Sequence, residues 1–589
     1  NPLAIFNVLL HDPKYKHFKH IRVLDDLSQH QDLIQKYKPY KNVRFVQHDT
    51  RAYLKALCTA KYLVNNSTFL SYFVKKPEQV YINTWHGIPL KHMGYDQPHD
   101  KVNVANTVRN FLQTDYLISA NSLMDDMYLK AYKLDGVYEG KVLQSGYPRL
   151  DTTLHCQKEE VLRELRNHGV KVEDGKKIVL YAPTWKGNDF YNPDCDIEDY
   201  IALKKRIEQK VGEDYQVLIK VHQVVYKYIK DEIDQYDYIV PATVDANVVL
   251  SVADVLISDY SSIFFDYLVT DRPVLFYIPN VNSYKKNRGL NLTLEELPGP
   301  YTDRSEEIAK WLADVETACA GSRERYEKMR AWCCPEDAGQ ISEKIVQSIF
   351  AGKEDAVSAH TCANQKKKIL FVQGNMAVNG MTSAMMNLLE EIDYDKYDVT
   401  LYVNFKEKSQ QKNADLVDDR VRLIARTGTF FATLREDMRM NLYNRRGYIK
   451  FWKAFCPKKV YEREFRRCVG AGHFDYVIDY DGFSFFFSML ALSSGDGAVK
   501  CIWCHSDMHG EATVRFPWLK RVFTLYPLFD KVVSCSKEIM EVNRKNLATP
   551  ESYDHFTYAK NAVNYKKVLH GLEKSRTTEK DGKLFYLQR

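Results

Sequence analysis

The chain has 589 residues, of which 45% are hydrophobic and 27% are charged, with 83 basic residues against 77 acidic ones. This length exceeds a single core and predicts three or four domains of roughly 150 residues each. The net charge of +6 is small for the length, and no dense basic segment is present, which argues against a nucleic-acid-binding protein. No apolar run approaches the ~18 residues that span a bilayer, and no signal peptide opens the chain. The 12 cysteines lack regular spacing and fit a reducing cytoplasm.

Residues 1–155 alternate short apolar strands with helical stretches, which is typical of an α/β domain. Residues 80–82 predict a strand, and Trp85-His86-Gly87 follows at its exit, where open α/β sheets bind ligands. A histidine at this place can act as a general base at neutral pH. The alternative for His86 is a hydrogen-bonded histidine of the core. The turn after it carries Lys91.

Residues 156–351 repeat the α/β pattern. One predicted strand, 215–223, delivers Lys220 and His222 at its end. A later stretch predicts a strand at 255–257, a polar turn and a helix from Ile263, followed by a further strand after Pro273. Ser261 and Ser262 in that turn place hydroxyls and unpaired N–H groups where an anion such as phosphate is favoured. The alternative for both serines is simple helix capping.

Several motifs of this region occur together in the order of one enzyme family. They are WHGIPLKHMG, GYPRLD, VLYAPTWKG, LIKVH, DANVVLSVADVLISDYSSIFFDY and PVLFY, followed by Tyr284 and Arg288-Gly289. In these motifs, residues 1–350 resemble the CDP-glycerol glycerophosphotransferases, the teichoic acid polymerases and primases of bacterial envelopes. Two departures are Ile88, where threonine is common, and Gln223, where proline usually follows the histidine. The family's early segment also resembles residues 1–24, which implies a first strand upstream of the chain.

The resemblance implies a GT-B fold, in which two Rossmann-like domains face each other across a cleft and the second binds CDP-glycerol. The reaction is attack of an acceptor hydroxyl on the β-phosphorus, with CMP leaving. His86 is then expected to be the general base and His222 a second essential histidine on the pyrophosphate side. The expected phosphate or substrate ligands are Ser261, Ser262, Lys220, Arg288, Asp266 and Lys91. For Asp266, Lys220 and Arg288 a structural salt bridge or cap is an equal alternative. No tightly bound cofactor or metal is expected, while Mg²⁺ carried by the substrate stays open.

The C-terminal part predicts a further domain. Residues 352–367 lack apolar periodicity and predict a linker, and residues 368–589 begin with a strand, a glycine loop and a helix. This third Rossmann-like domain resembles the N-terminal half of a retaining GT-B glycosyltransferase, truncated at the chain end, with His505 as a candidate site residue. Cys501 and Cys504 have no second cysteine pair to complete a zinc site, so they are expected to pack as small hydrophobes.

The leading hypothesis is therefore a bacterial enzyme that builds a polyol-phosphate polymer and has a glycosyltransferase-like domain fused to it. One alternative is the same chemistry with CDP-ribitol. Another is a sugar transferase in which the first unit only binds substrate. The expected partners are a lipid-linked polyol-phosphate acceptor and the membrane surface, with peripheral location on the cytoplasmic face. No nucleic-acid partner is expected.

Overall fold

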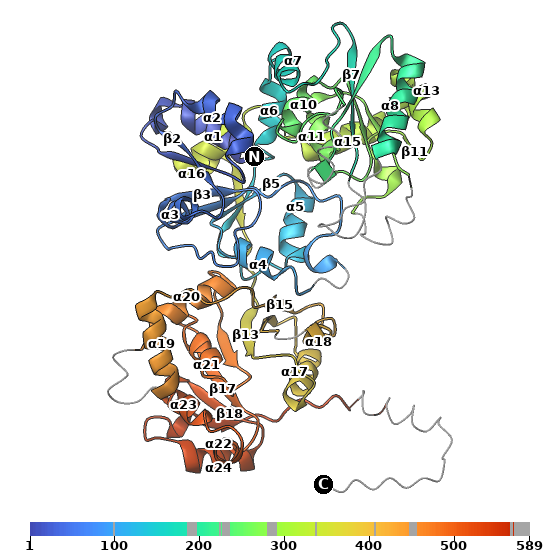
Figure 1. The fold of residues 1–589 in the computed structure, drawn as a ribbon. Coiled ribbons are helices and arrows are strands. Elements are labelled where there is room, and N and C mark those ends of the chain that lie inside the picture. The colour runs from blue at the N-terminus through green and yellow to red at the C-terminus, as the bar shows by residue number, and fades with distance from the viewer. Residues whose placement is uncertain are drawn as a thin grey trace.

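The computed structural model describes residues 1–97, 101–184, 197–222, 225–226, 236–279, 291–335, 338–405, 408–446, 456–565 and 569. Figure 1 shows two α/β units side by side at one end of the molecule, and a third α/β unit beneath the first. The prediction of an α/β fold with several parallel sheets is confirmed.

The first sheet has the strand order β12-β6-β5-β4-β3, and its four consecutive strands β3 to β6 run parallel. A separate parallel pair, β1 with β2, precedes it. The buried faces of β4 and β5 carry fully enclosed apolar side chains, which is the pattern of a sheet covered on both faces. The strands are β1 (His20–Leu24), β2 (Val43–Gln47), β3 (Tyr62–Asn65), β4 (Val80–Asn83), β5 (Tyr116–Ser119) and β6 (Lys141–Gln144), and the helices are α1 (Pro2–His11), α2 (Gln31–Tyr37), α3 (Arg51–Thr59), α4 (Ala105–Phe111), α5 (Ser122–Asp126) and α6 (Arg149–His155).

The second sheet has the order β11-β10-β9-β7-β8, and all its pairs are parallel. The chain passes from β7 to β8 on one side and then returns to place β9 on the other side of β7. Strand order therefore reverses between β7 and β9, and such a switch point is where open α/β sheets bind ligands. The strands are β7 (Lys177–Ala182), β8 (Tyr215–Ile219), β9 (Val255–Ser258), β10 (Val274–Tyr277) and β11 (Tyr301–Thr302), and the helices are α7 (Lys158–Asn167), α8 (Ile197–Val211), α10 (Ala246–Val252), α11 (Ile263–Tyr267), α13 (Ser305–Ala313), α14 (Val315–Ala320) and α15 (Arg323–Cys333).

The third sheet has seven parallel strands in the order β15-β14-β13-β16-β17-β18-β19, with its switch point between β13 and β16. The strands predicted for this region are present. They are β13 (Lys367–Gln373), β14 (Tyr397–Val403), β15 (Arg422–Ala425), β16 (Tyr476–Asp479), β17 (Val499–Cys504), β18 (Lys531–Ser534) and β19 (Phe556–Tyr558), and the helices are α17 (Gly380–Glu391), α18 (Lys408–Gln411), α19 (Leu434–Arg446), α20 (Lys458–Val469), α21 (Phe485–Leu492), α22 (Met508–Val514), α23 (Leu519–Phe523) and α24 (Lys537–Leu547).

The segment 352–367 is more than the linker that the sequence predicts. It contains β12 (Ser358–Thr361), which pairs antiparallel with β6 and so extends the first sheet. The helix before it, α16 (Ile341–Phe350), packs against α1, and the Phe350 ring lies 4.6 Å from that of Tyr62. Figure 1 shows α16 among the first helices of the chain. The missing periodicity is explained because β12 is an edge strand whose residues are mostly exposed.

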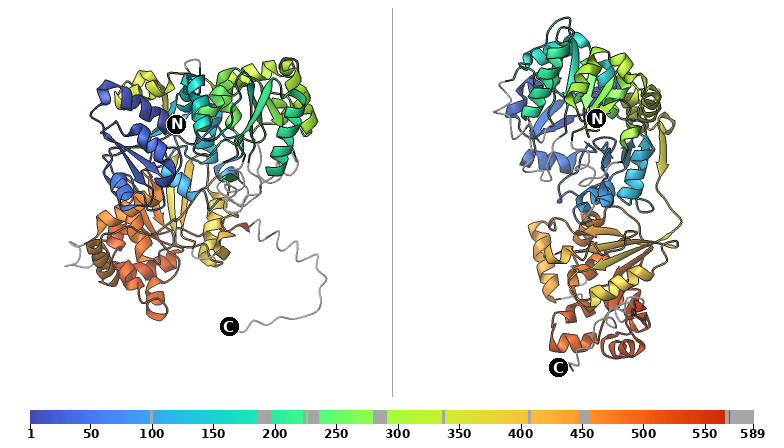
Figure 2. Two further views of the ribbon diagram at one scale, coloured as in Figure 1. Left: turned by 45° about the horizontal axis from the view of Figure 1, so that its top comes forward. Right: turned by 90° about the vertical axis from the view of Figure 1, so that its right-hand side faces the viewer.

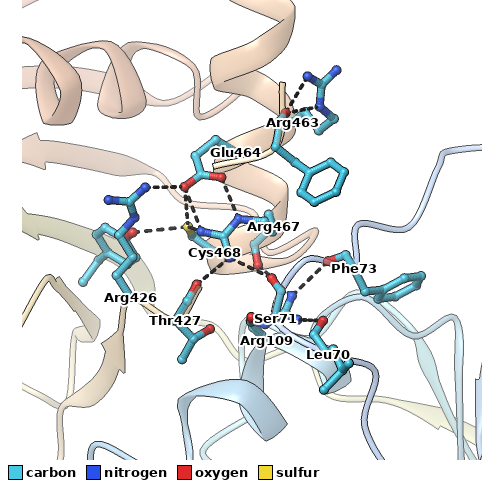
Figure 3. A network of polar contacts seen from close by, with 12 residues as sticks. Leu70, Ser71, Phe73, Arg109, Arg426, Thr427, Arg463, Glu464, Arg467 and Cys468 are labelled. Carbon is cyan, nitrogen blue, oxygen red and sulfur yellow. Dashed lines mark hydrogen bonds and ion pairs between the residues drawn. The ribbon is translucent and has the colours of Figure 1, made fainter. Parts of the chain in front are cut away.

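A buried polar network joins the first sheet's domain to the third (Figure 3). Arg467 of α20 donates to both carboxylate oxygens of Glu464 at 2.6 and 2.8 Å, and to the Ser71 carbonyl at 2.8 Å. Arg109 of α4 donates to the Arg467 carbonyl at 3.1 Å. Both arginines are only 1% exposed, so the two domains share a desolvated interface. Two views in Figure 2 show the third domain seated against the first.

None of the helices in the described part of the chain is sufficiently long and apolar to cross a membrane.

Candidate active site

His86 leaves the first sheet at the carboxyl end of β4. The side chain of buried Asn83 accepts a hydrogen bond from the Trp85 N–H at 2.8 Å. Trp85 itself has a φ of 48°, a strained value for a bulky residue, and is held by burial against Phe111. This fixed kink directs His86 outward, and its side chain reaches solvent.

The imidazole of His86 reaches solvent, but the protein surrounding it still removes part of its hydration. This desolvation, aided by the nearby positive charge of Arg149, lowers the pKa of His86 to about 4. The ring is therefore neutral at physiological pH. A neutral imidazole can accept a proton, which is what a general base requires.

Arg149 connects the His86 loop to the second domain. Its guanidinium donates to the His86 carbonyl at 2.9 Å and forms a two-point ion pair with Asp266 of α11, at 2.8 and 3.0 Å. The Asp266 side chain is 8% exposed, and burial raises the pKa of this carboxyl while the Arg149 charge opposes the rise. Asp266 is expected to be either a substrate ligand or a partner in a structural ion pair. The structure shows such an ion pair, and it joins the two domains.

Gly87 lies between these groups. A side-chain carbon at Gly87 would stand 3.0 Å from Arg149 Nη2 and 3.7 Å from Ser262 Oγ, and its φ of 148° also disfavours other residues. Gly87, which follows His86, therefore lies close to the serine turn. The loop that carries His86 and the turn that carries Ser262, both predicted site residues, are neighbours across the two domains.

The serine turn lies at the end of β9, beside the switch point of the second sheet. Ser262 occupies the N-cap position of α11 without a side-chain capping bond, and Ser261 Oγ accepts only a long contact of 3.4 Å from Ile263 N–H. This weakens the alternative that the serines are only caps. Because α11 has five residues, its dipole is small, and hydroxyls and backbone N–H groups are the main anion-binding features.

Asp259 ties the two switch-point strands together. Its carboxylate accepts the Thr184 N–H at 3.0 and 2.9 Å, which joins the end of β7 to the end of β9. Burial raises the pKa of Asp259, whereas the Thr184 bonds and the positive charge of Lys91 oppose this rise. Lys91, from the first domain, therefore acts electrostatically at the switch point of the second.

Lys220 and His222, at the end of β8, differ in their exposure to solvent. Lys220 is buried and donates to the carbonyls of Pro241 and Val244 at 2.6 and 2.8 Å, and burial lowers its pKa to about 8. These bonds match the structural alternative named for Lys220, since the ammonium holds the 241–244 turn, and its expected role as a phosphate ligand stays a prediction. His222 is exposed just beyond β8. Arg288 and Tyr284 lie outside the described residues, as do Trp185 and Lys186.

Comparison with known proteins identifies this two-domain unit. The model of the family described as CDP-Glycerol:Poly(glycerophosphate) glycerophosphotransferase matches residues 1–351. The chain belongs to this family.

Two curated relatives and one solved structure of the glycerophosphotransferase family show the extent of the likeness. The teichoic acid poly(glycerol phosphate) polymerase of Bacillus spizizenii is 30% identical over 59% of this chain and 88% of the relative. The polymerase of the same name from Bacillus subtilis is 29% identical, over 53% of this chain but only 42% of the relative. A variant of the wall teichoic acid polymerase TagF soaked with CDPG is 25% identical, with a TM-score of 0.50, and covers 60% of this chain and 86% of that one.

The third domain lies outside the glycerophosphotransferase match, and His505 follows β17 there. Its Nε2 is 2.6 Å from the Tyr480 carbonyl, and burial lowers its pKa. Asp479 ends the neighbouring strand β16, and Asp481 follows it. Burial and the charge of Asp481 raise the pKa of Asp479 to about 7, and a side-chain carbon at Gly374 would lie 2.8 Å from the Asp481 carboxylate. These groups meet at the switch point of the third sheet.

Sequence reasoning missed Arg149 and Asp259 as site residues. Both follow predicted strands, in the motifs GYPRLD and ISDYSS, so their positions carried a signal. Their partners, however, lie 117 and 75 residues away in sequence. No group of three or more potential metal-ligating side chains occurs within the described residues.

Proposed function

We propose that the first two α/β domains transfer glycerol phosphate from CDP-glycerol to a hydroxyl of a polyol-phosphate acceptor and release CMP. The observation that carries this proposal is the convergence of His86, Arg149, Asp266 and Ser262 at the switch point of a chain in the glycerophosphotransferase family. The proposal includes a GT-B arrangement of the two domains, for which the Arg149–Asp266 contact is support.

In this reaction an acceptor hydroxyl attacks the β-phosphorus of CDP-glycerol. The new O–P bond forms as the bond from phosphorus to the bridging pyrophosphate oxygen breaks, and that oxygen leaves on CMP. His86 takes the hydroxyl proton, since its depressed pKa keeps it neutral. Ser261, Ser262 and Lys91 bind the phosphate oxygens, and His222 acts on the leaving-group side. Such positioned donors stabilise the charge that develops in the transition state.

We propose that the protein needs no tightly bound cofactor or protein-ligated metal, with Mg²⁺ arriving on the substrate if at all. Its acceptor is lipid-linked, and the enzyme works at the cytoplasmic face of the membrane. CDP-ribitol is the alternative donor. The curated relatives named above, whose names specify glycerol phosphate, support the glycerol form.

The test uses the full chain with labelled CDP-glycerol or CDP-ribitol, a lipid-linked glycerol-phosphate acceptor, and EDTA in a parallel series. CMP release from CDP-glycerol is expected, and loss of that release in His86→Ala and His222→Ala supports the assigned roles. His360→Ala, a histidine of β12 in the same sheet, is the control and retains activity. Release that persists in both variants overturns the catalytic assignment, and release from CDP-ribitol alone replaces the substrate.

A second candidate function concerns the third domain. We propose that its switch point binds a polyhydroxylated ligand such as a sugar, because Asp481 and His505 lie there beside the close approach at Gly374. In the corresponding alternative, the first unit only binds substrate. Turnover of UDP-sugars without turnover of any CDP-alcohol supports that alternative, and the reverse result removes it.

A further inference from the structure

Helix α19 of the third domain presents apolar side chains to solvent. Leu434, Met438 and Leu442 are 74%, 63% and 38% exposed, and they recur every four residues. Residues with this spacing lie on one face of a helix. Phe431, immediately before the helix, is 57% exposed. Contiguous exposed apolar patches on a protein surface are typical of interaction sites, whereas singly exposed apolar residues are not.

The same side of α19 carries positive charge. Arg435, Arg439 and Arg445 are exposed. At 100° per residue, Arg435 and Arg439 lie along one edge of the apolar row and Arg445 lies in line with it. Asp437 is the exposed acidic residue of the helix, while Glu436 is engaged by Arg463. Apolar residues interleaved with arginines are the composition of helices that lie in the interface of an anionic bilayer.

The rest of the domain holds α19 in this orientation. Met440 and Tyr443, on its opposite side, are 6% and 1% exposed. Arg463 of α20 donates to both carboxylate oxygens of Glu436 at 3.2 and 2.8 Å. The apolar row is therefore fixed toward solvent. Figure 1 shows α19 itself on the outer edge of the third domain.

A neighbouring segment continues this chemistry. Helix α23 packs beside α19, and the chain entering it exposes Val514 by 79% and Trp518 by 46%. Arg515 and Lys520 are exposed in the same segment. Trp518 keeps its ring half in solvent while its Nε1 donates to the Phe483 carbonyl at 3.3 Å. Tryptophan beside basic residues is typical of protein surfaces at the membrane interface.

We propose that α19 and residues 514–520 form a face that docks on an anionic lipid bilayer. Leu434, Met438 and Leu442 enter the headgroup region, and the arginines contact lipid phosphates. Charge complementarity favours this occupant over a protein partner, because the basic residues alternate with the apolar ones along the whole helix. The face lies outside residues 1–351, so docking and phosphate transfer are separate properties that can be measured separately.

The test is flotation of the full chain with vesicles of phosphatidylglycerol and phosphatidylcholine, and with phosphatidylcholine alone. Binding to the anionic vesicles is expected, and it weakens as salt rises from about 0.05 to 0.5 M. The triple variant Leu434→Gln, Met438→Gln, Leu442→Gln is expected to bind roughly 10-fold less tightly or worse. The variant Arg435→Gln, Arg439→Gln, Arg445→Gln shows a comparable loss and a smaller salt dependence.

Leu416→Gln is the control, since Leu416 is 69% exposed elsewhere in the same domain and its replacement leaves binding unchanged. A measurement on the unmodified protein avoids any question of folding, because the amides of α19 gain hydrogen-exchange protection when anionic vesicles are added. The proposal is overturned by absence of flotation, or by flotation that both triple variants retain. Protection of α19 without vesicles, in a concentration-dependent dimer, would assign the face to a second copy instead. CMP release from a water-soluble acceptor stays unchanged in the triple variants, whatever the vesicle result.

Discussion

The guanidinium of Arg149 forms a two-point ion pair with the carboxylate of Asp266, with Nε 2.8 Å from Oδ2 and Nη2 3.0 Å from Oδ1. One partner comes from the first domain and the other from the second. Since the same arginine also donates to the His86 carbonyl, the pair links α11 of the second domain to the loop that carries the proposed base.

Replacing Arg149 by alanine is expected to reduce CMP release on the order of 100-fold, because small displacements of a reacting group carry costs of that size. It also leaves the buried Asp266 carboxylate without its partner, which destabilises the fold by about 3 kcal/mol or more. Enzyme assays and urea denaturation measure the two effects. Arg166→Ala is the control, because the Arg166–Asp174 pair is largely exposed and contributes roughly 1 kcal/mol or less. Full activity in Arg149→Ala would show that the pair has no part in catalysis.

The pH dependence of the reaction follows from the pKa of His86. Because that pKa is lowered to about 4, the ring stays neutral through the physiological range, and protonation removes the base only as pH falls toward 4. The acid limb of kcat/KM is therefore expected well below the ordinary histidine pKa of about 6.5. Arg149→Gln removes a positive charge that lowers this pKa, so the acid limb moves to higher pH. NMR titration of the His86 ring gives an independent reading, and a midpoint near the ordinary value contradicts the mechanism.

Much of this architecture was accessible from the sequence. The turn after β9 and the exits of β4 and β8 follow from apolar runs that stop at polar residues, which is a local pattern. The roles of Lys220 and Asp266 were not accessible in this way, because a basic or acidic residue near a strand end serves a ligand or a fold equally well. The carbonyls of Pro241 and Val244, to which Lys220 donates, become its neighbours only in the folded chain.

The attachment of the third domain was missed for a related reason. Arg109 and Arg467 are charged residues in amphipathic helices, and sequence pattern assigns such residues to solvent. Their burial depends on hydrogen bonds to backbone carbonyls that are distant in sequence. Arg109 donates to a carbonyl 358 residues away, and Arg467 donates to one 396 residues away. No local pattern carries that information, and β12 was missed because an exposed edge strand lacks apolar alternation.

The buried network at this interface predicts a large effect of Glu464→Ala. Its carboxylate is 1% exposed and binds both Arg467 and Arg426, so its removal leaves two positive charges without compensation. A loss of about 3–5 kcal/mol in unfolding free energy is expected. Glu436→Ala, on the partly exposed pair with Arg463, costs roughly 1 kcal/mol or less and is the control. Urea denaturation checks both, and equal small effects would show that the interface is not held by this network.

The contribution of Asp479 to stability is expected to fall as pH rises, whereas that of most aspartates rises with pH. Its pKa rises to about 7 from an ordinary 3.8, chiefly through burial and secondly through the charge of Asp481. Between these two values the folded protein holds a proton that the unfolded chain releases, so this contribution to stability is largest at low pH. It is lost as pH rises toward 7.

Asp479→Asn cannot ionise, and its amide oxygen can still accept the Gly482 N–H. Its amide N–H₂ then faces the Ser488 hydroxyl, which can accept from it while donating to the Ser484 carbonyl. The variant is therefore expected to flatten the fall in third-domain stability across that pH interval, by an amount on the order of a few kcal/mol. Hydrogen exchange of the β13 and β16 amides at several pH values measures this. Asp475→Asn is the control at the opposite end of β16, where hydrogen bonds from Lys368 and Lys367 lower the pKa of Asp475. That variant loses stability mainly above the Asp475 pKa, and the same pH profile in both variants would contradict the assignment to Asp479.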